Sequence, residues 1–100
     1  MMQLELTRSA LQDLKSIARH TQERWGIKQR NTYLKELDQA FRSVAKNPLI
    51  GRACDEVRAG YRKLPHGSHV IYYKSAPDHV LVVRVLHAMM DVETNIGPNA

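Results

Sequence analysis

The sequence predicts an α+β fold in which a helical hairpin packs on one face of a small, mainly antiparallel sheet, in the order β-α-α-β-β-β. Two observations carry this prediction. Apolar residues recur about every 3.6 positions before Pro48, as they do on one face of a helix. After Pro48, short β-branched and aromatic runs alternate with turns that contain glycine or proline. We assign residues 1–100 to a single domain, because a chain of this length has room for only one core.

The first two elements are a short strand and a long helix. Residues 3–6 alternate between polar and apolar side chains, which is typical of a strand. Thr7 or Ser9 then caps a helix that runs to about Trp25, because a hydroxyl at that position accepts from the free amides of the first turn. Gly26 ends this helix. Its apolar stripe consists of Ala10, Leu11, Leu14, Ile17, Ala18 and Trp25.

A second amphipathic helix follows and ends at Asn47-Pro48, because the residue before a proline is disfavoured in helical geometry. Its inner stripe consists of Leu34, Leu37, Phe41 and Val44, flanked by Tyr33 and Ala40. The short link around Gly26 makes the two helices an antiparallel hairpin. Two helices side by side cover one face of a sheet, so we expect the other face to be solvated or covered by something else.

Three strands are expected in the second half of the chain. They lie within residues 57–64, at 69–74 and at 80–86, separated by turns at 65–68 and 75–78. The last is almost continuously apolar apart from Arg84, so we expect it to be central and covered on both faces. The tail from about residue 89 has little to hold it apart from a few apolar residues. These are Met89, Met90, Val92 and Ile96.

The composition predicts a cytoplasmic protein with an anionic partner and no membrane span. The net charge is +5, and residues 58–87 hold five Lys or Arg against Asp78 alone. Such a surface suits nucleic acid, a nucleic-acid-bound machine or an acidic protein, although a basic surface can also lack a partner. Cys54 is the single cysteine, which excludes an intrachain disulfide and fits a reducing compartment. The longest apolar run, Val80–Val83, is far too short to cross a membrane.

Several short motifs occur in a specific order. They are Trp25-Gly26, Asn47-Pro48-Leu49-Ile50-Gly51-Arg52, Gly60-Tyr61-Arg62, Val70-Ile71-Tyr72-Tyr73 and Val83-Arg84-Val85-Leu86-His87. Together with Ala10, Leu14 and Ile17, they resemble the ParE branch of the RelE/ParE toxins over residues 4–93. The resemblance implies the toxin of a type II toxin–antitoxin system, which inhibits DNA gyrase without catalysis. It also implies a ParD-like antitoxin that neutralises the toxin in a hetero-oligomer, with DNA contacted only indirectly.

The same superfamily contains RelE toxins, which cut messenger RNA on the ribosome, and this is the main alternative. RNA cleavage requires a general base, a general acid and cations around the phosphate. By strand position, Arg62 and His69 are the nearest counterparts of the RelE residues, with Lys63 an uncertain third. No tyrosine follows Tyr73 and no basic cluster follows the last strand, so we favour a protein that is not an enzyme. A toxin fold that only binds an antitoxin is a third possibility.

Two binding surfaces are predicted, and no cofactor or metal is expected. We assign target binding to Arg84, His87, Met89 and Met90. We assign antitoxin binding to the outward side of the hairpin or to the open sheet face, with Arg62, Tyr72, Val82, Arg84 and Leu86. Arg62 and Arg84 can instead form structural ion pairs with Asp55, Glu56 or Asp91. The turn histidines, His66 and His69, lack the further ligands that a metal site requires.

Overall fold

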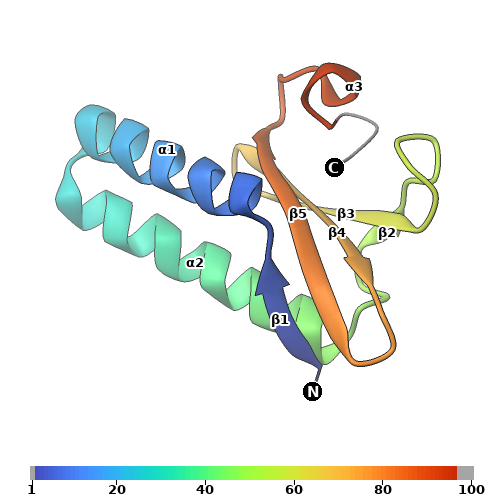
Figure 1. The fold of residues 1–100 in the computed structure, drawn as a ribbon. Helices are drawn as coiled ribbons and strands as arrows, with labels where there is room; N and C mark the ends of the chain where they lie inside the picture. The colour runs from blue at the N-terminus through green and yellow to red at the C-terminus, as the bar shows by residue number, and fades with distance from the viewer. Residues whose placement is uncertain (1, 97–100) are drawn as a thin grey trace.

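The structure, a computed structural model, describes residues 2–96 and consists of a helical hairpin on a five-stranded mixed sheet (Figure 1). The elements are β1 (Gln3–Leu6), α1 (Arg8–Trp25), α2 (Ile27–Lys46), β2 (Arg52–Ala53), β3 (Tyr61–His66), β4 (His69–Ser75), β5 (His79–His87) and α3 (Val92–Asn95). The strand order is β1-β5-β4-β3-β2, in which β1 runs parallel to β5 and the other pairs are antiparallel. The predicted fold class is confirmed, with β2 and α3 as additions.

Capping fixes both ends of α1. The hydroxyl of Thr7 accepts from the Ala10 amide (2.9 Å) and donates to the Val83 carbonyl (2.7 Å), so the start of the helix is tied to β5. Gly26 separates α1 from α2 with a φ of 94°, a conformation that glycine adopts without the steric cost of a Cβ. The two helices therefore meet at a single residue. They fold back on each other as the predicted hairpin (Figure 1).

The main core lies between the hairpin and the sheet. Its buried members are Ala10, Ile17, Leu37, Phe41, Val44, Ile71, Tyr73, Val80, Val82 and Val85. The predicted stripe of α2 is confirmed, since Leu34 packs against this cluster and the rest of the stripe belongs to it. Two members of the α1 stripe are wrong as core residues. Leu11 is 49% exposed and Trp25 67% exposed, because they lie at the margin of the stripe and at the helix end.

β3 begins within the predicted range of residues 57–64 but ends later than predicted, at His66. Residues 55–60 form turns, and the strand then continues through Pro65 to His66, which pairs with His69. Proline is tolerated there because β2 pairs with β3 only at Arg62 and Lys63. The remainder of β3 is thus an edge strand, where the missing backbone amide of Pro65 costs no hydrogen bond between strands.

β5 carries a bulge that changes which side chains face the helices. Tyr73 pairs with Val82 while Tyr72 pairs with Arg84, so Val83 is the extra residue. Before the bulge Val82 faces the main core, whereas after it Leu86 faces the opposite side of the sheet. The prediction that this strand is covered on both faces is confirmed.

The second face of the sheet is covered by the chain itself. A smaller cluster there contains Cys54, Tyr61, Tyr72, Val83, Leu86 and Ile96, with Val57, Val70, Leu81 and Val92 packed around it. The loop after β2 and the segment around α3 thus supply the cover that the sequence left open (Figure 1). This differs from the expected loose tail, although residues 97–100 lie outside the described part. Among the described residues, no helix is long and apolar enough to cross a membrane.

Candidate functional site

The residues predicted for antitoxin binding on the open sheet face do not form an exposed surface. Tyr72 and Leu86 are buried in the second cluster, and Val82 is buried under the helices. The expectation that Val82 and Leu86 share a face is wrong, because the bulge at Val83 breaks the alternation of side chains along β5. Tyr72 and Tyr73 point to opposite faces of the sheet, and both are buried.

Arg84 is engaged in an ion pair that joins three elements. Its Nε and Nη2 donate to the two carboxylate oxygens of Asp13 on α1 (2.7 and 2.8 Å), and its Nη1 donates to the carbonyl of Asn95, the last residue of α3 (2.5 Å). The Asp13 carboxylate also accepts from the Val85 amide, and its hydrogen bond to the guanidinium raises the pKa of Arg84. Arg84 does form an ion pair, but its partner is Asp13 rather than the predicted Asp55, Glu56 or Asp91.

Arg62 also stabilises the fold. Its Nη1 donates to the Gly51 carbonyl (2.7 Å) in the loop between α2 and β2. The Tyr73 hydroxyl holds the same loop, because it donates to the Pro48 carbonyl (2.7 Å) and accepts from the Gly51 amide (2.8 Å). A Cβ at Gly51 would collide with the Tyr73 ring. The motif from Asn47 to Arg52 is therefore explained by how this loop is fastened to β3 and β4.

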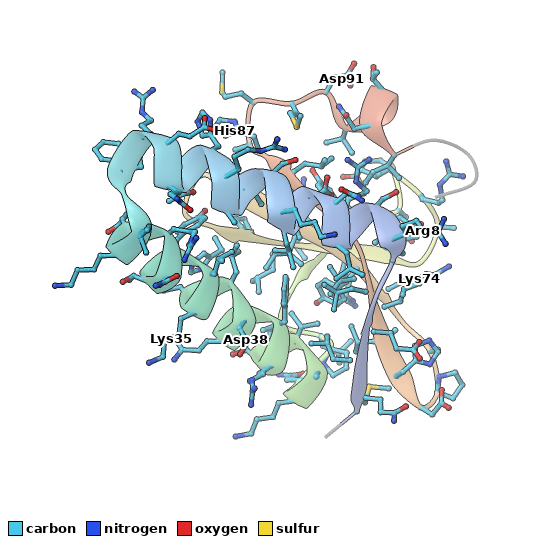
Figure 2. All side chains as sticks on the ribbon, turned by 60° about the vertical axis from the view of Figure 1, so that its left-hand side comes forward. Arg8, Lys35, Asp38, Lys74, His87 and Asp91 are labelled. Carbon is cyan, nitrogen blue, oxygen red and sulfur yellow. The ribbon has the colours of Figure 1, made fainter. Side chains whose placement is uncertain are left out.

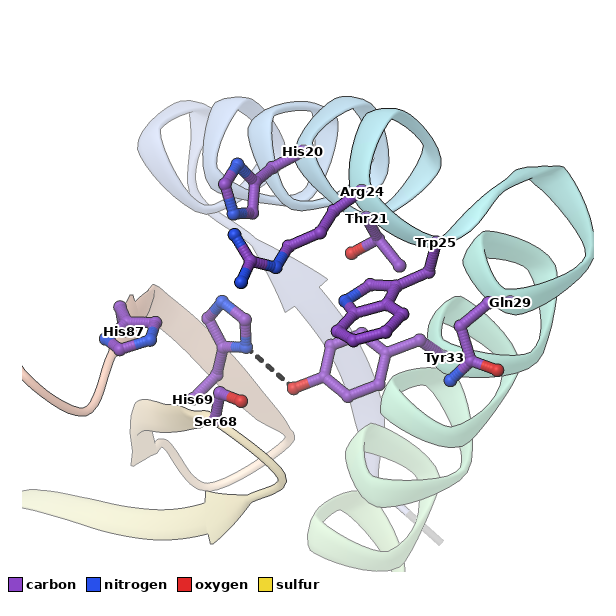
Figure 3. Close-up of a pocket in the computed structure, with 9 residues that line it drawn as sticks. All are labelled: His20, Thr21, Arg24, Trp25, Gln29, Tyr33, Ser68, His69 and His87. Carbon is purple, nitrogen blue, oxygen red and sulfur yellow. Dashed lines mark hydrogen bonds between the residues drawn. The ribbon is translucent and has the colours of Figure 1, made fainter.

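The residues predicted for a ribonuclease, Arg62 and His69, are not brought together. Arg62 pairs with Tyr73, while His69 lies at the other end of β4. Four residues along a strand separate the two positions by about 13 Å. His69 instead belongs to a pocket of about 440 Å³, here called the histidine pocket (Figure 3). It is lined by His20, Thr21, Arg24, Trp25, Gln29, Tyr33, Ser68, His69 and His87.

Within the histidine pocket, His69 is held by Tyr33 of α2. The Tyr33 hydroxyl is hydrogen-bonded to Nδ1 of His69 (2.6 Å) and donates to the His66 carbonyl (3.2 Å). The His87 ring meets the His69 ring edge-on, with the centroids 5.5 Å apart. Burial lowers the pKa of His69, and the neighbouring imidazoles of His87, His20 and His66 lower it further. Among the described residues, no three or more His, Cys, Asp or Glu side chains are placed so that they could hold a metal ion.

Three of the residues predicted for target binding lie together at the end of β5 and in the turn that follows it, a segment here called the His87–Met90 loop. Met89 is 87% exposed and Met90 is 48% exposed, and His87 is exposed beside them. The loop is compact, because Nδ1 of His87 accepts from the Met89 amide (3.1 Å) and the Met90 amide donates to the His87 carbonyl (2.9 Å). Arg84 lies behind this loop, with its side chain only 19% exposed.

A second exposed apolar surface lies along the hairpin and is here called the hairpin groove. It has a volume of about 430 Å³. It is lined by Leu4, Leu6, Leu11, Leu14, Lys15, Ala18, Leu34, Leu37, Asp38 and Phe41. The sequence prediction named the outward side of the hairpin but not these residues. The sequence feature that indicates the hairpin groove is Leu11, an apolar residue at the margin of the α1 stripe. Figure 2 shows Asp38 of this groove well away from His87.

Comparison with known proteins gives a consistent assignment. The family described as "ParE toxin of type II toxin-antitoxin system, parDE" matches residues 4–92. The chain is 48% identical over 92 residues to Toxin ParE1 of Mycobacterium tuberculosis, which covers 91% of this chain and 94% of that protein. It is 36% identical over 92 residues to Toxin ParE1 of Caulobacter vibrioides, covering 92% of this chain and 95% of that protein.

Solved structures show the same fold. A chain of the chromosomal ParDE toxin–antitoxin system from P. aeruginosa aligns with a TM-score of 0.74 at 20% identity, covering 87% of this chain and 96% of that chain. A chain of the toxin–antitoxin complex RelBE2 from Mycobacterium tuberculosis aligns with a TM-score of 0.64 at 19% identity, covering 86% and 96%. The structural likeness supports the fold, and the sequence matches establish the family. The chain belongs to the ParE toxin family of type II toxin–antitoxin systems.

Proposed function

We propose that this ParE-family chain inhibits DNA gyrase by binding it, and that a ParD-like antitoxin neutralises it in a hetero-oligomeric complex. The observation that carries the proposal is a pair of separate exposed apolar surfaces, the hairpin groove and the His87–Met90 loop. Exposed apolar surface on a small protein commonly marks a binding site. Two such surfaces suit a protein with one target and one inhibitor. Gyrase acts in the cytoplasm, and DNA is then reached only through gyrase.

The hairpin groove is the proposed antitoxin site. An amphipathic helix can bury its apolar face in such a groove, with anchors spaced at three or four residues. Among the described charges at the groove, Asp38 is neutralised by Arg42 at 2.9 Å, whereas Lys15 has no acidic partner. An acidic residue beside the apolar face of the antitoxin helix would therefore pair with Lys15 and help to orient it. This assignment replaces the buried strand residues Tyr72, Val82 and Leu86.

The His87–Met90 loop is the proposed contact with gyrase. Methionine side chains are flexible and polarisable, so two of them side by side can adapt to an apolar surface on a partner. Arg84 is assigned a supporting role, because its bonds to Asp13 and Asn95 hold the segment on either side of the loop. Binding is favoured over RNA cleavage because Arg62 of β3 is hydrogen-bonded to Gly51 and pairs with Tyr73, four residues along β4 from His69.

The test adds purified protein to gyrase, ATP and relaxed plasmid, and follows supercoiled and linear DNA on a gel. We expect loss of supercoiling together with cleaved plasmid, and reversal of both when the ParD-like antitoxin is added. Normal supercoiling in the presence of folded protein would reject gyrase as the target. Cleavage of ribosome-bound message would then indicate the RelE activity, and harmless overexpression with retained antitoxin binding would indicate a protein that only binds its partner.

A further inference from the structure

The histidine pocket gathers four protonatable or cationic side chains from three separate elements. His20 and Arg24 come from α1, His69 begins β4 and His87 ends β5, and Figure 3 shows all four directed toward one space. No Asp or Glu is among the described residues that line it. The proposed antitoxin and gyrase surfaces leave this combination unused, although His87 also belongs to the exposed loop. The side chains of the histidine pocket therefore suit an anionic ligand.

Several of these side chains keep a nitrogen available for a ligand. Nδ1 of His69 is bonded to the Tyr33 hydroxyl (2.6 Å), and Nδ1 of His87 accepts from the Met89 amide (3.1 Å). Because Nδ1 of His87 accepts a hydrogen bond, Nε2 of that ring carries the hydrogen and is a donor. The Tyr33 hydroxyl donates to the His66 carbonyl, so Nδ1 of His69 donates to Tyr33 and Nε2 of the neutral His69 ring is an acceptor. Arg24 forms no ion pair within the described part of the chain, so its guanidinium is available as a forked donor.

The carboxylate of Asp13 lies near the pocket and could repel an anion, but it is already hydrogen-bonded within the fold. Asp13 lines an adjoining hollow and accepts both from Arg84 and from the Val85 amide. Its charge is compensated by the guanidinium that it contacts. The excess of donors in the histidine pocket is therefore not cancelled by Asp13.

An aromatic platform lies at the edge of the same pocket. Trp25 is 67% exposed, and the Arg24 guanidinium carbon lies 5.7 Å from the centroid of its ring. Tyr33 lines the pocket next to these residues (Figure 3). Proteins recognise unpaired bases by stacking them on aromatic rings and on the guanidinium plane of arginine. An exposed indole beside an arginine and a set of imidazoles thus combines a surface for a base with donors for a phosphate.

We propose that the histidine pocket binds a nucleoside phosphate, with the phosphate held by Arg24, His20 and His87 and the base against Trp25. Its volume of about 440 Å³ is in the range of small-molecule sites. The same chemistry can come from a free nucleotide or from the terminal nucleotide of a single strand. The inference does not depend on gyrase or antitoxin binding, since it rests on the groups that line this pocket.

The test uses the chain's single tryptophan as a probe, because Trp25 lies in the pocket. Adenosine 5′-monophosphate, adenosine and a short single-stranded oligonucleotide with a 5′-phosphate are titrated separately, by Trp25 fluorescence and by calorimetry. We expect saturable quenching and heat with the monophosphate, and much weaker binding of adenosine. Arg24→Gln should weaken binding about tenfold, the loss of one charge-assisted hydrogen bond. His87→Gln should weaken it in the same direction.

The matched control is Arg19→Gln, which removes the same charge from an exposed position of α1 outside the pocket. Its affinity should equal that of the unmodified chain. Tighter binding of the oligonucleotide than of the monophosphate would identify a strand end as the ligand, and equal binding would identify the free nucleotide. Absence of both quenching and heat with every phosphate-containing probe would overturn the proposal. Equal losses in Arg24→Gln and Arg19→Gln would overturn it too, because binding would then follow net charge alone.

Discussion

At the scale of single residues, the ion pair between Arg84 and Asp13 illustrates how a charge that resembles a binding residue can instead hold the fold together. The two side chains are 19% and 13% exposed, and their contact joins β5 to α1. The sequence predicted an ion pair for Arg84 but not this partner, which is 71 positions away. No local pattern identifies a contact of that range. Only the packing of the hairpin on the sheet brings the two residues together.

Asp13→Asn should lower the free energy of unfolding by about 3 kcal/mol, because it leaves the largely buried Arg84 guanidinium without a counter-charge. Urea unfolding measures the change. The control is Asp38→Asn, which removes the same charge from the Asp38–Arg42 pair, whose side chains are 53% and 71% exposed. An exposed pair of this kind contributes about 0.5 kcal/mol. Similar losses in the two variants would contradict the structural role of Arg84.

His69 should make the stability depend on pH. Burial lowers its pKa from the usual 6.5, as do His87, His20 and His66 around it, while Asp13 acts in the opposite direction. The unfolded chain therefore binds the proton more readily than the folded one. The stability due to the neutral ring is fully present above pH 6.5 and is lost as the pH falls through the lowered pKa of the folded state.

Urea unfolding of the unmodified chain and of His69→Gln, compared over a series of pH values below 7, tests this expectation. The free energy of unfolding of the unmodified chain should fall with pH, and the slope should be shallower in the variant because the titrating ring is absent. Loss of the Tyr33 hydrogen bond lowers the variant's stability at every pH, so the slope rather than the level is decisive. Parallel slopes would show that His69 does not carry the effect.

At the scale of elements, the start of α1 depends on one hydroxyl that serves both the helix and the sheet. Thr7→Val keeps the shape of the side chain but removes its hydrogen bonds to the Ala10 amide and the Val83 carbonyl. We expect a loss of about 2 kcal/mol, from one cap and one further hydrogen bond. Ser9→Ala removes an exposed hydroxyl two residues later and should cost less than about 0.5 kcal/mol. Equal costs, measured by urea unfolding, would mean that Thr7 is not the cap.

The two long helices and the strands β1, β4 and β5 were predictable almost to their ends, whereas β2, α3 and the bulge in β5 were not. Periodicity, the hydroxyl at Thr7 and the glycine at residue 26 define α1, and Asn47-Pro48 defines the end of α2. β2 has only two residues, too few for any pattern. The bulge at Val83 could not be read from a strand that is apolar at almost every position, because such a run shows no alternation to interrupt.

At the scale of the whole molecule, one sheet face is covered by the hairpin and the other by the loop after β2 and the segment around α3. The sequence predicted the first layer from the two amphipathic helices. It left the second open, because Ile96 and Cys54 give no sign that they meet. Because this second sheet face is covered, the antitoxin site is proposed in the hairpin groove. The loop at Met89 and Met90 then forms a distinct exposed surface.

The central claim is that antitoxin and target bind different surfaces. Leu11→Glu places a charge in the hairpin groove, and Gln12→Glu is its control on the exposed side of α1 outside that groove. A double variant, Met89→Ser with Met90→Ser, alters the other surface, with Leu49→Ser as the control for removal of an exposed apolar side chain. All of the substituted residues are exposed, so each variant should keep the fold of the unmodified chain.

The decisive measurement is gyrase supercoiling by each variant, with and without the ParD-like antitoxin. Leu11→Glu should still inhibit gyrase but escape the antitoxin, and the double methionine variant should bind the antitoxin but leave supercoiling unaffected. Both controls should behave as the unmodified chain does. If Leu11→Glu remained fully neutralised, or if the methionine variant inhibited gyrase undiminished, the assignment of two surfaces would be contradicted.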